Sequence, residues 1–85
     1  MGSRKRELGA EKALEKAEKR VRQGEYERAF EYLDIAIRDP RLGYLKGTYL
    51  EYRQKAEKAS SGLLYYHLLL LVRILRNALR EMDTQ

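Results

Sequence analysis

The fold is decided by the stretch Leu63-Leu64-Tyr65-Tyr66-His67-Leu68-Leu69-Leu70-Leu71-Val72, the longest apolar run of this 85-residue chain. Only His67 interrupts the run, so a helix formed here has no polar face, and such a helix is expected to be covered by its neighbours. The run has about half of the ~20 residues that a helix needs to cross a bilayer, so we expect a buried helix rather than a membrane span.

After Arg73 the same helix becomes amphipathic, which predicts a fourth helix over residues 63–82 that is central to the fold. Its outer residues are Arg73, Arg76, Asn77 and Arg80. Its expected spine is Leu64, Leu68, Leu71, Leu75 and Leu79. If fewer than three helices cover it, part of the leucine-rich surface is exposed and the sequence favours a homodimer through this helix.

Apolar stripes at helical spacing predict three further helices upstream, over residues 7–23, 25–38 and 44–59. Gly24 is expected to end the first helix in a left-handed conformation, and Asp39-Pro40 to end the second, leaving residues 39–43 as a loop. The short connections imply antiparallel neighbours. The sequence therefore predicts an all-α four-helix bundle of antiparallel hairpins, a single domain over residues 7–83. The stripes are Ala10, Leu14, Ala17 and Val21; Tyr26, Ala29, Phe30, Leu33, Ala36 and Ile37; and Leu45, Tyr49, Tyr52, Ala56 and Ala59.

Length and composition exclude several classes of protein. The chain is too short for a multidomain enzyme, and without cysteine it has neither disulfides nor thiolate metal sites. Residues 1–6 are expected to be a disordered, tag-like basic arm. Because no apolar run follows this arm, we expect no secretory signal and an intracellular or recombinantly expressed soluble protein.

The residues that could carry catalysis or metal binding are few. His67 is the only histidine, and we interpret it as partly buried or groove-facing rather than as a base, since no catalytic partner can be named for it. One histidine with scattered carboxylates falls below the ligand number of a dedicated metal site. The pairs Glu11 with Glu15 and Glu27 with Glu31 fall on polar faces, where water keeps both members ionised. We therefore predict no enzymatic activity and no catalytic, cofactor-binding or metal-binding residue.

The net charge of +5 raises the alternative of weak nucleic-acid binding through a basic face. Three of these charges come from the arm, and three more from residues 40–58, which hold five basic and two acidic residues; the rest of the chain is close to neutral. The candidate face comprises Arg41, Lys46, Arg53, Lys55 and Lys58 with Tyr44 and Tyr52. A solvated helix face is the simpler interpretation, so nucleic acid is not an expected partner.

Residues 13–40 resemble the helical hairpin of a tetratricopeptide repeat. The likeness rests on the turn at Gly24, on Tyr26, on the small residues Ala29 and Ala36, and on Pro40. The first-helix positions depart from that pattern, and no second copy follows. The resemblance covers about one hairpin.

A weaker resemblance is to the microtubule-interacting and trafficking domain. It is carried by Lys12-Ala13-Leu14, Lys16-Ala17, Gly24, Tyr26 and Ala29, and by Glu51-Tyr52 with Ala56-Glu57-Lys58. This resemblance implies a three-helix bundle that binds a partner's terminal helix in a groove.

The whole chain resembles a designed helical bundle, with a tag-like start, no Cys or Trp, and short loops between helices of similar length. The first expectation is therefore a designed or scaffold-type bundle with no biochemical activity beyond folding and no required partner. The alternative is an interaction module that binds a helical peptide.

Overall fold

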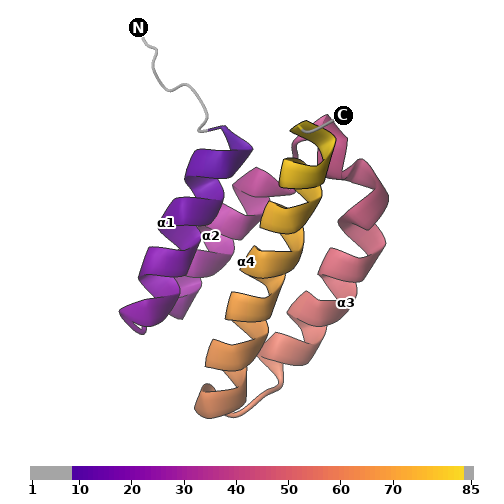
Figure 1. Ribbon diagram of the computed structural model, residues 1–85. Helices are drawn as coiled ribbons and strands as arrows, with labels where there is room; N and C mark the ends of the chain where they lie inside the picture. Colours follow the sequence, from indigo (N-terminus) through magenta and orange to yellow (C-terminus); the bar gives the residue numbers. More distant parts are fainter. Residues whose placement is uncertain (1–8, 84–85) are drawn as a thin grey trace, which may run out of the picture.

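The computed structural model describes residues 9–83, and the expected basic arm at residues 1–6 lies outside them. Over this range the chain is all-α (Figure 1). The elements are α1 (Ala10–Arg22), α2 (Tyr26–Ala36), the 3₁₀ helix η1 (Pro40–Leu45), α3 (Lys46–Glu57) and α4 (Ser61–Asp83). Successive α-helices run in alternating directions, which confirms the predicted four-helix bundle of antiparallel hairpins.

Gly24 makes the turn between α1 and α2 as predicted. Its φ of +80° is left-handed, a conformation that costs other residues energy because of their Cβ atom. The amide of Gly24 donates to the carbonyl of Val21, and the amide of Glu25 donates to that of Arg20 at 2.9 Å. These two bonds satisfy carbonyls that the end of α1 would leave unpaired.

The connection after α2 differs from the expected loop. Asp39 accepts a hydrogen bond from the backbone amide of Arg41 at 2.9 Å, and Pro40 opens η1 at a position where its missing amide costs nothing. This 3₁₀ turn buries Leu42, which the apolar stripes do not include. As a result α3 begins at Lys46 rather than at residue 44.

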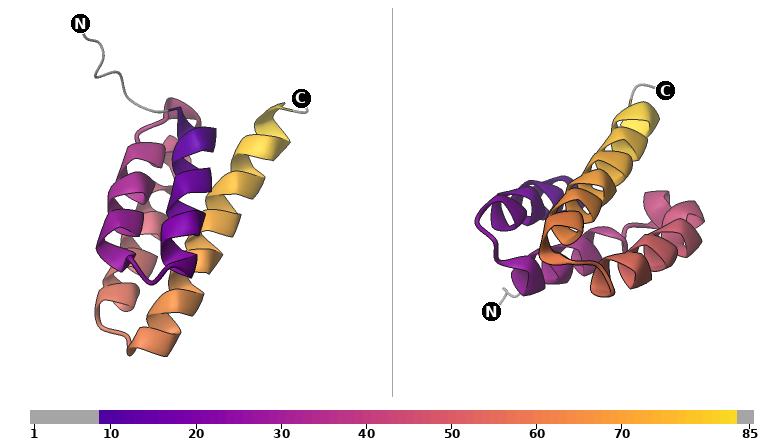
Figure 2. Two further views of the ribbon diagram at one scale, coloured as in Figure 1. Left: turned by 90° about the vertical axis from the view of Figure 1, so that its left-hand side faces the viewer. Right: turned by 90° about the horizontal axis from the view of Figure 1, so that it is seen from below.

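The core forms where α4 meets the α1–α2 hairpin. Alanines occupy much of the α1–α2 interface, where small side chains allow a close approach. From α4, the side chains of Leu68, Leu71, Leu75 and Leu79 are almost fully buried, and Leu64 is partly buried, as the predicted spine requires. Seen from below, α4 lies between the α1–α2 pair and α3 (Figure 2).

Helix α4 is central in its contacts, since it touches every other helix and η1. It is not enclosed, however. The expectation that neighbouring helices cover the apolar run of α4 on every side is wrong. Leu63 is 55% exposed and Tyr66 is 59% exposed. Three short helices and one 3₁₀ turn cover only one side of a 23-residue helix, so its outer side faces solvent.

By length and composition alone, α4 could also cross a membrane. Within Gly62–Met82 an 18-residue window has a mean hydropathy of 1.2, and 33% of that window is buried inside the bundle. The core helix of a soluble protein passes the same test. The expectation of no membrane span therefore stays a prediction.

Side chains rather than close backbone packing join α2 to α3. The hydroxyl of buried Tyr49 on α3 donates to the carboxylate of Asp34 on α2. Arg53 lies 3.4 Å from the same carboxylate and stacks over the ring of Phe30 at 4.9 Å from its centroid. These contacts hold α3 on the bundle from the side opposite α4's exposed face.

Candidate functional site

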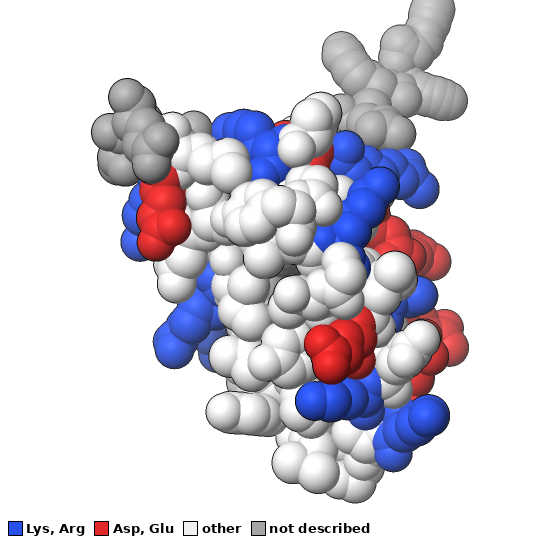
Figure 3. Space-filling view, turned by 90° about the vertical axis from the view of Figure 1, so that its right-hand side faces the viewer, with Lys and Arg blue, Asp and Glu red and all other residues white. Residues whose placement is uncertain are grey.

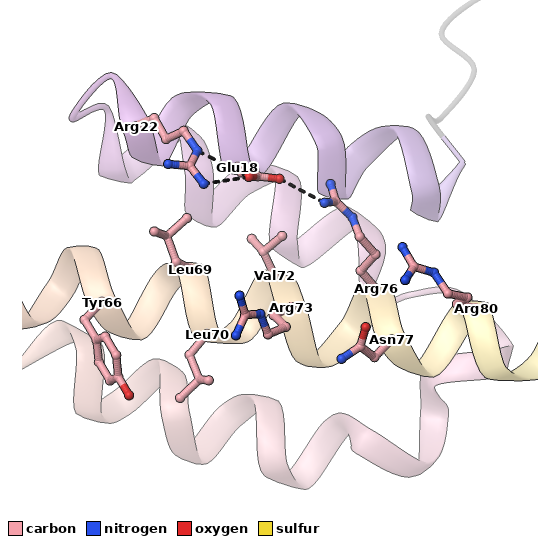
Figure 4. A pocket seen from close by; sticks show the side chains of 10 residues that line it. All are labelled: Glu18, Arg22, Tyr66, Leu69, Leu70, Val72, Arg73, Arg76, Asn77 and Arg80. Atoms are coloured by element: carbon pink, nitrogen blue, oxygen red, sulfur yellow. Dashed lines mark hydrogen bonds and ion pairs between the residues drawn. The ribbon is translucent and has the colours of Figure 1, made fainter.

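A groove of about 440 Å³ runs along the outer side of α4, where it meets α1 (Figure 4). Eight of its lining residues belong to α4 and two to α1. They are Tyr66, Leu69, Leu70, Val72, Arg73, Arg76, Asn77 and Arg80, with Glu18 and Arg22. Because α4 is straight and continuous here, side chains three and four residues apart follow one another along the groove.

The two halves of the groove differ in chemistry. Towards the N-terminus of α4 the residues that this helix contributes are apolar, namely Tyr66, Leu69 and Leu70, and Arg22 of α1 lies on the opposite side (Figure 4). In Figure 4, Leu69 points towards α1, whereas Tyr66 and Leu70 point towards α3. An exposed apolar surface of this kind loses unfavourable contact with water when another molecule covers it.

Towards the C-terminus of α4 the lining is cationic. Arg73, Arg76 and Arg80 follow one another at spacings of three and four, with the neutral amide of Asn77 among them. A second hollow of about 210 Å³ continues the groove past Arg76 and Arg80 to Glu11 and Leu14 of α1. The site therefore passes from an apolar end to an arginine-rich end along a single helix.

Glu18 on α1 is the acidic residue that lines this groove, and it is bound to two of the arginines. Its carboxylate accepts hydrogen bonds from Arg22 at 2.9 and 3.2 Å and lies 3.0 Å from the guanidinium of Arg76 (Figure 4). The hydrogen bond from Arg22 lowers the pKa of Glu18; partial burial opposes this effect, and Arg76 adds to it. Glu18 therefore remains ionised and joins α1 to α4 across the groove.

His67 lies beside the groove rather than in it. Its ring stands edge-on to that of Tyr66, with centroids 5.9 Å apart, and its Nδ1 atom is buried without a hydrogen-bond partner within the described residues. Across residues 9–83, no three His, Asp or Glu side chains are grouped so that they could hold a metal ion. The pairs Glu11 with Glu15 and Glu27 with Glu31 are exposed, as expected.

The basic face considered for residues 41–58 is divided in the structure. Arg41 is bound to Asp39 at 2.8 Å and to Glu11 at 3.3 Å, and Arg53 is bound to Asp34 and Glu57. Lys46 and Lys58 lie at opposite ends of α3, about 18 Å apart along its axis. On the α3 side, blue side chains are scattered among uncharged and acidic ones (Figure 3). Exposed Tyr44 and partly buried Tyr52, which lies under Lys55 at 5.4 Å, do not join them into one surface.

Comparison with models of known families, with curated proteins and with solved structures finds no match for this chain. The likenesses to a tetratricopeptide hairpin, to the trafficking domain and to a designed bundle therefore rest on the sequence alone.

The groove contains residues that the sequence places on the outside of the last helix without assigning them a role. The spacing of Arg73, Arg76 and Arg80 puts them on one face and could have indicated a cationic stripe. The pairing of Glu18 with Arg22 also follows from their four-residue spacing. The pairing of Glu18 with Arg76 could not be found this way, because it depends on which helices become neighbours.

Proposed function

We propose that this protein is a non-catalytic interaction module that binds an acidic, amphipathic helix of a partner protein in the α1–α4 groove. The observation that carries the proposal is the continuity of the apolar lining at Tyr66, Leu69 and Leu70 with the arginines that follow on the same helix. A partner helix whose apolar residues cover the first part and whose carboxylates meet the second part would complement both.

The length of the site fits a helix. From Tyr66 to Arg80 the axis of α4 rises by about 21 Å, so a partner helix of about 14 residues lies along the whole groove. A nucleic-acid backbone fits less well, because it needs available cations along its full length, and Arg22, the cation at the apolar end of the groove, is already bound to Glu18.

The test is direct binding of a synthetic peptide. A fluorescein-labelled amphipathic helix of about 14 residues, with leucines in one half and glutamates in the other, is titrated with the protein in about 0.15 M salt. A second peptide carries lysines in place of the glutamates. We expect fluorescence anisotropy to report binding of the acidic peptide and not of the basic one.

A matched pair of variants locates the binding surface. Leu70→Asp puts a charge into the groove, whereas Leu50→Asp makes the same change on α3 at a side chain that is 54% exposed and outside the groove. We expect the first variant to weaken binding about tenfold or more and the second by less than about twofold. Absence of binding, or equal effects of the two variants, would overturn the proposal.

If the acidic peptide does not bind, the first expectation from the sequence becomes the better proposal. In that case the chain is a scaffold-type or designed bundle whose property is its fold, and the exposed side of α4 is surface left uncovered by a short chain.

A further inference from the structure

The four arginines of the groove are not equally available. Glu18 binds Arg22 and Arg76 at distances of 2.9 to 3.2 Å. Within residues 9–83, the side chains of Arg73 and Arg80 have neither an ion pair nor a hydrogen bond. Both side chains are exposed. A ligand that reaches the groove therefore meets two paired guanidinium groups and two unpaired ones.

Arg73 and Arg80 are separated by seven residues. Seven residues are nearly two turns of an α-helix, so both arginines lie on the same face, with their Cα atoms about 10.5 Å apart along the axis. A partner helix lying along α4 has the same rise per residue. Two carboxylates that are seven residues apart on that partner therefore repeat the spacing of the two arginines.

We infer that the groove selects a partner helix bearing two carboxylates seven residues apart. These carboxylates bind Arg73 and Arg80, while Arg22 and Arg76 remain bound to Glu18. This inference rests on the proposed helix-binding function and specifies the partner. A carboxylate that approached Arg76 would meet a guanidinium whose charge Glu18 already neutralises in part. The charges of Arg73 and Arg80 are not neutralised in this way, so they determine which acidic pattern fits.

Two peptides of identical composition test the pattern. Both carry the same leucines over the apolar half. In the first peptide the two glutamates are seven residues apart on the leucine-bearing face; in the second, one glutamate is moved by two positions, which turns it about 200° away. We expect the first peptide to bind at least about tenfold more tightly. Equal affinities would overturn the inference but not the proposed helix-binding function. If neither peptide binds, the inference and the proposed function are both overturned.

Protein variants test which arginines bind the two glutamates of the first peptide. Arg73→Gln and Arg80→Gln are compared with Arg22→Gln, which removes the same charge from the same groove but from a guanidinium that Glu18 already occupies. We expect the first two to weaken binding of the first peptide about tenfold, and Arg22→Gln to change it less than about twofold. Equal losses in all three would mean that only total charge matters, and would overturn the inference. Thermal melts establish that each variant is folded.

Discussion

The carboxylate of Glu18 on α1 lies 3.0 Å from the guanidinium of Arg76 on α4 and also accepts hydrogen bonds from Arg22, one turn further along α1. Two helices that are far apart in the sequence are thereby joined across the rim of the groove. The bridge has two effects: it contributes to the attachment of α4, and it neutralises part of the positive charge that a ligand would meet.

The bridge predicts how stability depends on pH. A carboxyl group whose pKa is lowered by folding stabilises the folded state above its unfolded pKa of about 4.3, and this contribution is lost as the pH falls through the folded pKa. We expect Glu18→Gln to be less stable than the parent protein at pH 7, with a loss of less than about 1 kcal/mol in the free energy of unfolding and a lower melting temperature. The difference should shrink as the pH falls through the lowered pKa of Glu18 and vanish once the parent carboxyl is also neutral.

Circular dichroism melts between neutral and acid pH measure this difference. Glu27→Gln is the matched control, because Glu27 is exposed and has no ion pair within the described residues. A difference between Glu18→Gln and the parent that stays constant down to acid pH would show that packing, not charge, is responsible.

Leu71 should account for a large part of the stability of the bundle. Its side chain is 1% exposed at the centre of α4, so Leu71→Ala leaves a cavity among packed neighbours. We expect a loss of about 2 to 5 kcal/mol in the free energy of unfolding, measured by urea titration. Leu63→Ala removes the same atoms from a side chain that is 55% exposed and should cost less than about 0.5 kcal/mol. Similar losses in both variants would contradict this packing.

Much of the fold follows from local patterns. The glycine at position 24, the four-residue spacing from Ala10 to Leu14 and the leucines of the last helix each act through neighbours in the sequence, so the helices and their buried faces could be predicted. The share of the surface of α4 that they cover could not be predicted, because it depends on how far three short helices reach around a longer one. For the same reason the exposed groove and the bridge to Arg76 were beyond sequence reasoning.

Gly24 should be difficult to replace although space is available around it. No heavy atom lies within 4 Å of where a Cβ would stand, so the cost of Gly24→Ala comes from the positive φ alone. We expect this variant to lose about 1 to 2 kcal/mol of unfolding free energy in a urea titration. Gly43→Ala adds a methyl group with equal room and no positive φ, and should have little effect. Equal stability of the two variants would contradict a left-handed turn at Gly24.

Tyr49 should ionise only far above the usual pH range of a tyrosine. Burial, together with its hydrogen bond to Asp34, raises the pKa of its hydroxyl far above the usual value of about 10. The stability that the neutral hydroxyl of Tyr49 contributes is therefore fully present below about pH 10. It is lost as the pH rises towards the pKa of Tyr49 in the folded protein. Absorbance at the tyrosinate band should show one of the seven tyrosines ionising only when the protein unfolds.

In Tyr49→Phe that late step should disappear, and the unfolding free energy at pH 7 should fall by about 1 kcal/mol because the hydrogen bond between α2 and α3 is lost. Tyr44→Phe, at a side chain that is 65% exposed, is the control and should leave the late step in place. Absence of the late step in the parent protein would show that Tyr49 is not buried between α3 and the rest of the bundle.

The exposed side of α4 could mediate self-association. The sequence favours a homodimer through this helix if its leucine-rich surface is uncovered. In a symmetric pair with the two α4 helices parallel, Arg73 and Arg80 of one copy face those of the other and repel. In an antiparallel pair the arginines lie over the apolar half and lose water without gaining a counter-charge. We therefore expect light scattering to give the monomer mass of 10.1 kDa even at about 0.1 mM. Replacing Arg73 and Arg80 by Leu should produce a concentration-dependent dimer, whereas a dimer of the parent protein would contradict the expected repulsion.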